Sequence, residues 1–75
     1  MTRHVYFGRD DNGIFVQDVR NDHATPATPV IGGSPVVDTM HLQLSHKGEN
    51  IIVYWREAEI ERESILTLVA QFLQD

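Results

Sequence analysis

The chain has 75 residues, a formal net charge of −5 and no cysteine. This length fits one domain, expected over residues 1–75, and 41% hydrophobic with 23% charged residues excludes both a disordered chain and a membrane span. Without cysteine there is no disulfide, thiolate nucleophile or cysteine-bound metal, and the lack of such crosslinks favours the reducing cytoplasm.

A first β-hairpin is predicted over about residues 3–20. Residues 3–7 and 14–19 are rich in the β-branched and aromatic side chains that strands favour. Between them, residues 8–13 are rich in Asp, Asn and Gly, which tolerate left-handed backbone angles, and Asn12-Gly13 is a strong hairpin dipeptide. The pattern predicts two antiparallel strands joined by a turn.

A long loop, flexible and rich in proline and glycine, is expected at about residues 21–36. Three prolines and two glycines in this stretch remove backbone donors and regular dihedral angles, so neither a helix nor a central strand is expected. Loops of this length in compact domains are usually functional or disordered.

A second hairpin follows. Met40, Leu42 and Leu44 alternate with polar residues, which indicates a half-buried strand, and the polar turn 46–50 leads into the apolar strand 51–56. That last strand is apolar on both sides, which predicts a central position with two covered faces.

The C-terminal part is predicted to be an amphipathic helix that begins between Ala58 and Ser64. A buried stripe at helical spacing, widened by Leu66 and Ala70, supports this prediction: Ile65, Leu68, Val69, Phe72 and Leu73. The expected fold class is therefore α+β: two antiparallel hairpins in a four-stranded sheet, joined by the long loop, with the helix packed on the sheet.

One helix covers only one face of such a sheet. Ile51, Val53 and Trp55 point one way along the last strand, and Ile52 and Tyr54 point the other way. The second face must be covered by the loop, by a second copy of the chain or by another partner.

The densest charge lies at residues 57–63, where four glutamates and one arginine give a net charge of −3. An extended chain would align all four carboxylates as a comb, whereas a helix would divide them into two columns. Beside an aromatic pair, this charge predicts a protein-binding surface made of Tyr54, Trp55, Glu57, Glu59, Glu61 and Glu63.

The sequence gives little indication of catalysis or of metal, cofactor, nucleic-acid or membrane binding. The sequence contains no phosphate-binding loop or nucleophile motif, and the spacing of the four histidines predicts no metal site, so neither catalysis nor a cofactor is expected. The acidic charge disfavours nucleic acid and the absence of a long apolar run disfavours membranes. An alternative is single-stranded nucleic-acid binding on a sheet face carrying Arg3, Tyr6, Arg9 and Arg56.

The leading prediction is a small acidic, non-enzymatic regulator or inhibitor of the kind that phages and mobile elements use. It would occlude a basic surface on a larger protein such as a nucleic-acid-processing machine. A homodimeric structural subunit is a further alternative.

Overall fold

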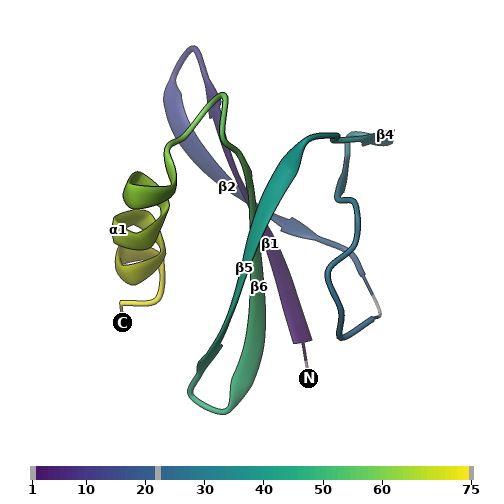
Figure 1. Ribbon diagram of the computed structural model, residues 1–75, viewed down its shortest axis with the longest axis vertical. Helices are drawn as coiled ribbons and strands as arrows, with labels where there is room; N and C mark the ends of the chain where they lie inside the picture. Colours follow the sequence, from purple (N-terminus) through teal and green to yellow (C-terminus); the bar gives the residue numbers. More distant parts are fainter. Residues whose placement is uncertain (1, 22, 75) are drawn as a thin grey trace.

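The computed structural model describes residues 2–21 and 23–74, so Asp22, within the predicted loop, lies outside the described residues. Six strands and one helix follow in the order β1 (Thr2–Asp10), β2 (Gly13–Val19), β3 (Val30–Ile31), β4 (Ser34–Pro35), β5 (Thr39–His46), β6 (Glu49–Arg56) and α1 (Arg62–Phe72). Figure 1 shows the helix on one side of the sheet and the β3–β4 region on the other. The expected α+β class is confirmed.

The main sheet has the strand order β2-β1-β6-β5. Its outer pairs are antiparallel, with Phe7 opposite Val16 and Leu42 opposite Val53. The central strands β1 and β6 run parallel, with Val5 opposite Val53. The sheet is therefore mixed rather than entirely antiparallel, because the two hairpins join through strands that point the same way.

The predicted 21–36 loop is not wholly irregular. Val30 pairs with Pro35 and Ile31 with Ser34, forming a small two-stranded sheet. The turn between these strands consists of Gly32 and Gly33, both at positive φ, where glycine avoids the strain of a side chain.

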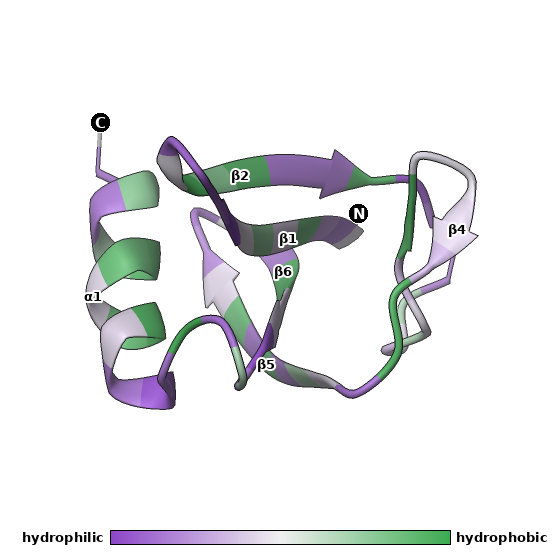
Figure 2. Cartoon of the chain, turned by 90° about the horizontal axis from the view of Figure 1, so that it is seen from above, coloured by the Kyte–Doolittle hydropathy of each residue, from purple (hydrophilic) through white to green (hydrophobic). Residues whose placement is uncertain are grey.

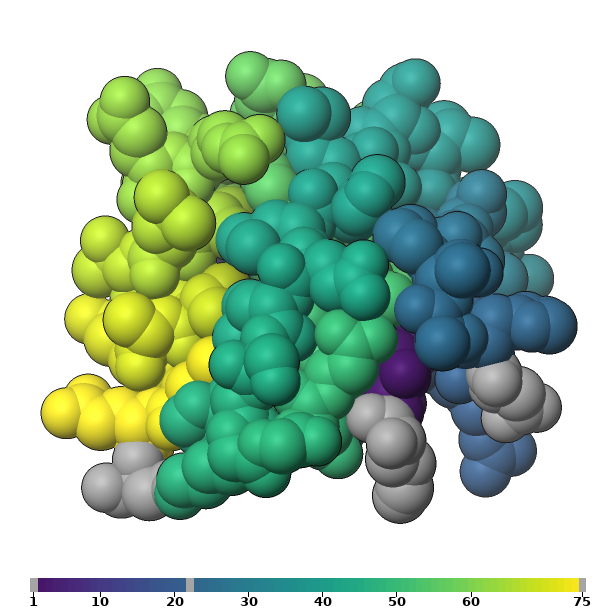
Figure 3. Space-filling model, turned by 60° about the horizontal axis from the view of Figure 1, so that its bottom comes forward, coloured from purple at the N-terminus to yellow at the C-terminus, as the bar shows by residue number. Residues whose placement is uncertain are grey.

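This strand order makes the described residues 20–21 and 23–38, which we name the crossing segment, pass over the sheet. β2 and β5 occupy opposite edges, so the chain that joins them must cross one whole face. In Figure 3 the crossing segment (blue) and the helix (yellow) lie on opposite sides of the β5–β6 hairpin. Of the three possible covers for the second face, the structure shows the loop of the chain itself.

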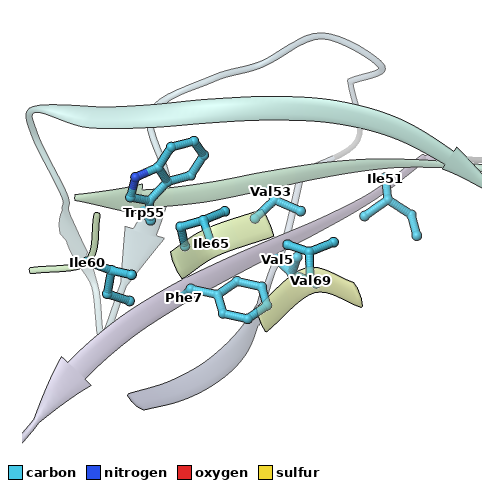
Figure 4. Close-up of a cluster of buried hydrophobic side chains, with 8 residues drawn as sticks. All are labelled: Val5, Phe7, Ile51, Val53, Trp55, Ile60, Ile65 and Val69. Carbon is cyan, nitrogen blue, oxygen red and sulfur yellow. The ribbon is translucent and has the colours of Figure 1, made fainter. Parts of the chain in front are cut away.

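The helix face of the sheet has an apolar core. Figure 4 shows its members, contributed by β1, β6, the turn after β6 and α1: Val5, Phe7, Ile51, Val53, Trp55, Ile60, Ile65 and Val69. Leu68, Phe72 and Leu73 pack against this core, but Leu66 is 55% exposed and Ala70 is exposed. The buried stripe of the helix is therefore narrower than predicted, because α1 touches the sheet along one side only.

Candidate functional site

The acidic end of the molecule is formed by two connections that lie at the same end of the sheet, at the top of Figure 1. One is the β1–β2 turn with Asp10 and Asp11, and the other joins β6 to α1. We define the acidic end as Asp10, Asp11, Glu57, Glu59, Glu61 and Glu63. With Arg9, Arg56 and Arg62 beside them, six acids and three arginines give −3 of the net charge of −5.

The glutamates at residues 57–63 form neither the comb nor the two columns that the sequence suggested. The chain turns after β6, where the N–H groups of Glu59 and Ile60 both donate to the carbonyl of Arg56, at 2.9 and 3.0 Å. Ile60 is 2% exposed and ties this turn to the core. The four glutamates therefore lie in the turn after β6 and at the start of α1. Figure 2 shows that the first part of α1 is hydrophilic.

Glu57, Glu61 and Glu63 are exposed. Glu61 is the N-cap of α1 but its side chain makes no capping hydrogen bond, and Glu63 lies in the first helical turn. Negative charge at this position is favoured by the partial positive charge of a helix N-terminus. Within residues 2–21 and 23–74, no ion pair neutralises these three carboxylates, so they face solvent as a charged surface.

Glu59 differs from its neighbours because it has an internal role. It is half-buried, and its Oε1 accepts a hydrogen bond of 3.2 Å from the hydroxyl of Tyr6. Burial, and then the negative charge of Glu59, raise the pKa of Tyr6 above its ordinary value of 10, partly opposed by Arg56. This bond ties the β6–α1 turn to β1, so Glu59 holds the acidic end in place.

The predicted aromatic anchors are not on the surface. Trp55 is 0% exposed and lies in the helix-face core, and Tyr54 is 2% exposed beneath the crossing segment. An anchor for a partner needs an accessible ring, so the binding role predicted for Tyr54 and Trp55 has to be corrected. Both rings are buried because β6 is a central strand of the sheet and each of its faces is covered.

The residues predicted for nucleic-acid binding do not share a face. Side chains alternate along β1, so Arg3 and Arg9 point to the helix face while Tyr6 points to the other. Arg3 donates to Asp18 at 3.1 Å, and its guanidinium lies 5.0 Å from the Phe72 ring centroid. Tyr6 is 4% exposed, so no open aromatic platform for bases is formed. Arg56 is half-buried, on the same side as Tyr6.

A hydrogen-bonded network under the crossing segment was not anticipated from the sequence. His4 is 2% exposed, with Nδ1 2.9 Å from the Tyr54 hydroxyl and Nε2 2.8 Å from the carbonyl of His23. The Ala27 N–H donates to the same hydroxyl at 3.1 Å. Because a carbonyl only accepts, Nε2 of His4 donates to the His23 oxygen.

The polar side-chain atoms of His4 and Tyr54 therefore form hydrogen bonds with each other and with the backbone of the crossing segment. A signal was available in the sequence, since His4 and Tyr54 lie on strands otherwise rich in apolar residues. The surface depressions nearby are shallow; one of about 330 Å³ beside His4 is lined by Arg3, Asp18, Arg20 and Glu49 among others. Within the described part of the chain, no group of three potential metal ligands converges.

No helix in the described ranges is long and apolar enough to cross a membrane. No protein-family model matches this chain, and neither a curated protein nor a solved structure matches it.

Proposed function

We propose that the protein is a small non-enzymatic regulator or inhibitor that binds a basic surface on a larger cytoplasmic protein through its acidic end. The observation that supports this most directly is the exposure of Glu57, Glu61 and Glu63 around the start of α1. Basic surfaces in a cell often belong to nucleic-acid-processing proteins, which are therefore the partner class proposed.

The position of the acidic end is compatible with this role. Ile60 and the Tyr6–Glu59 bond fix the turn after β6 to the body of the protein, so the exposed carboxylates sit on a rigid support. A preformed surface loses little conformational freedom on binding, which favours affinity. Without exposed aromatic anchors, electrostatic attraction carries the recognition, so binding should weaken as salt rises.

The test uses two variants with the same net charge. Neutralising the surface by Glu57→Gln, Glu61→Gln and Glu63→Gln changes the net charge from −5 to −2. The control adds three lysines at exposed neutral positions away from it, Thr25→Lys, Ser34→Lys and Ser45→Lys, and reaches −2 as well. Glu59 is left unchanged because it is bonded to Tyr6.

Each immobilised protein is used to capture partners from a native lysate with and without nuclease treatment, and captured proteins are identified by mass spectrometry. We expect a basic protein that both the unaltered chain and the lysine control retain and that the glutamine variant loses. Equal capture by all three proteins, or a partner that disappears on nuclease treatment alone, would contradict the proposal. The second outcome would favour nucleic-acid binding instead.

A further inference from the structure

The edge strand β2 carries features of a pairing surface. One side of its backbone pairs with β1, and no other strand of the described residues pairs with its opposite side. Edge strands of monomeric proteins are usually protected by lysine, proline, a bulge or a covering segment. β2, with the sequence Gly-Ile-Phe-Val-Gln-Asp-Val, has neither lysine nor proline.

The helix-face side of β2 is also apolar and open. Ile14 is 39% exposed and Val16 is 42% exposed, and both alternate onto the face that carries α1. Between this strand and the helix lies a groove of about 310 Å³, lined by Ile14, Ser64, Thr67, Leu68 and Gln71. α1 therefore stops short of covering the apolar stripe of β2.

The opposite edge strand, β5, differs in this respect. Its helix-face residues Leu42 and Leu44 are half-buried against the core, and Met40 is 36% exposed at the end of the strand. The remaining side chains of β5 are mainly polar. The two edges therefore differ: an uncovered apolar stripe follows the middle of β2, whereas the middle of β5 is already packed.

We propose that β2 pairs antiparallel with β2 of a second copy of this chain, so that two four-stranded sheets become one eight-stranded sheet. A two-fold axis at Phe15 places Ile14 opposite the partner subunit's Val16, and Val16 opposite the partner subunit's Ile14. Apolar cross-strand pairs of this kind stabilise antiparallel sheets. Shifting the axis to Val16 would instead place the Asp18 carboxylate opposite an isoleucine.

Charge complementarity favours a second copy over an unrelated strand. In the register centred on Phe15, Arg20 comes just after the end of β2 and lies near the partner subunit's β1–β2 turn, which carries Asp10 and Asp11, and this approach occurs twice. The antiparallel arrangement also sends the two acidic ends to opposite ends of the joined sheet. Two copies with a net charge of −5 each thereby keep their most acidic surfaces apart.

The first test measures mass by sedimentation equilibrium over a range of protein concentrations. We expect a reversible dimer of twice the 8.5 kDa chain mass. Val16→Lys should raise its dissociation constant at least about tenfold, because a charged side chain would replace the apolar partner of the partner subunit's Ile14 and the interface would gain two like charges. Val30→Lys is the matched control, since Val30 is 53% exposed on β3, and should leave the constant unchanged.

A monomer at every soluble concentration would overturn the proposal. A dimer that persists in the Val16→Lys variant would also overturn it, provided that circular dichroism shows both variants to be folded. A dimer of the second kind would be held by another surface. Binding of β2 to a different protein in place of a second copy would show as a monomer and would also count against it.

The second test determines the register by disulfide crosslinking. Because the chain has no cysteine of its own, every disulfide must join introduced cysteines. Ile14→Cys and Val16→Cys are prepared separately and oxidised alone or as an equal mixture. The register centred on Phe15 predicts a disulfide-linked product mainly in the mixture, because each position faces the other across the axis. Preferential crosslinking of Val16→Cys with itself would place the axis at Val16 and would refute this register.

Discussion

One face of the sheet is covered by a helix and the other by an irregular segment, and the side chains beneath the two covers differ accordingly. Under α1 the buried residues are aliphatic and aromatic, with Ile65 and Val69 of the helix against Val5 and Val53 of the strands. Under the crossing segment lie Tyr6, Val19, Ile52 and Tyr54, together with the histidine His4.

The difference follows from backbone hydrogen bonding. A helix satisfies most of its own N–H and C=O groups, so an apolar surface is sufficient beneath it. The crossing segment is largely irregular, and the carbonyl of His23 and the N–H of Ala27, which face the sheet in part-buried positions, bond to groups of the sheet. His4 and Tyr54 supply them, which explains why hydrogen-bonded polar rings lie on this face. The indole N–H of Trp55, on the helix face, is buried with no hydrogen-bond partner among the described residues.

The largest expected effect comes from removing a large side chain on the helix face. Trp55→Ala should lower the free energy of unfolding by about 3–5 kcal/mol, because the indole is fully buried and its removal leaves a cavity. At roughly 0.05–0.15 kcal/mol of stability per residue, a domain of this length has about 4–11 kcal/mol, so the loss removes a large share of the total. Urea denaturation followed by circular dichroism measures the change. A loss below about 1 kcal/mol would mean that the surroundings collapse around the site.

A smaller and more local effect is expected on the segment face. Tyr54→Phe removes the hydroxyl that accepts from the Ala27 N–H and bonds Nδ1 of His4, which leaves the buried Nδ1 and the part-buried N–H unpaired. The cost should be about 1–3 kcal/mol. Amide hydrogen exchange should rise around residues 23–27 while β1 and β6 stay protected. Equal loss of protection in all strands would show that the crossing segment is not a separable cover.

The burial of Tyr6, together with the nearby charge of Glu59, makes the stability of the segment face sensitive to alkaline pH. Because the folded pKa of Tyr6 is raised above 10, unfolded chains lose this proton first as pH rises. The stabilising contribution is complete below pH 10 and declines above it as the pH rises toward the folded pKa. Comparing the unfolding free energy of the unaltered protein and of Tyr6→Phe across this range should show a smaller decline in the variant. Parallel curves would exclude Tyr6 as the source.

The smallest predicted effect concerns the start of α1. Glu61 occupies the N-cap with extended angles (φ −70°, ψ 149°) but makes no side-chain capping bond. Glu61→Ser places a short hydroxyl where it can accept from the first helical turn and should raise stability by about 0.5–1 kcal/mol. Thermal unfolding measures the gain. Hydrogen exchange of the crossing segment should stay unchanged, since the helix covers the other face.

The sequence by itself determined the elements that depend on local chemistry. Periodicity at residues 65–73 predicted the C-terminal helix, and the run of apolar residues at 51–55 predicted a central strand with both faces covered. These signals are local because burial repeats every 3.6 residues in a helix and every two in a strand. Ile60 was missed because an isolated apolar residue in a turn has no period.

Tertiary structure alone decided how distant segments meet. The parallel pairing of β1 with β6 joins residues about fifty positions apart, and no turn chemistry specifies such a pairing. Once that pairing is set, β2 and β5 become opposite edges, the crossing segment must pass over the sheet, and Tyr54 and Trp55 are buried. Glu57, Glu61 and Glu63 stay outside because desolvating unpaired carboxylates is costly, so the acidic surface remains without its predicted aromatic anchors.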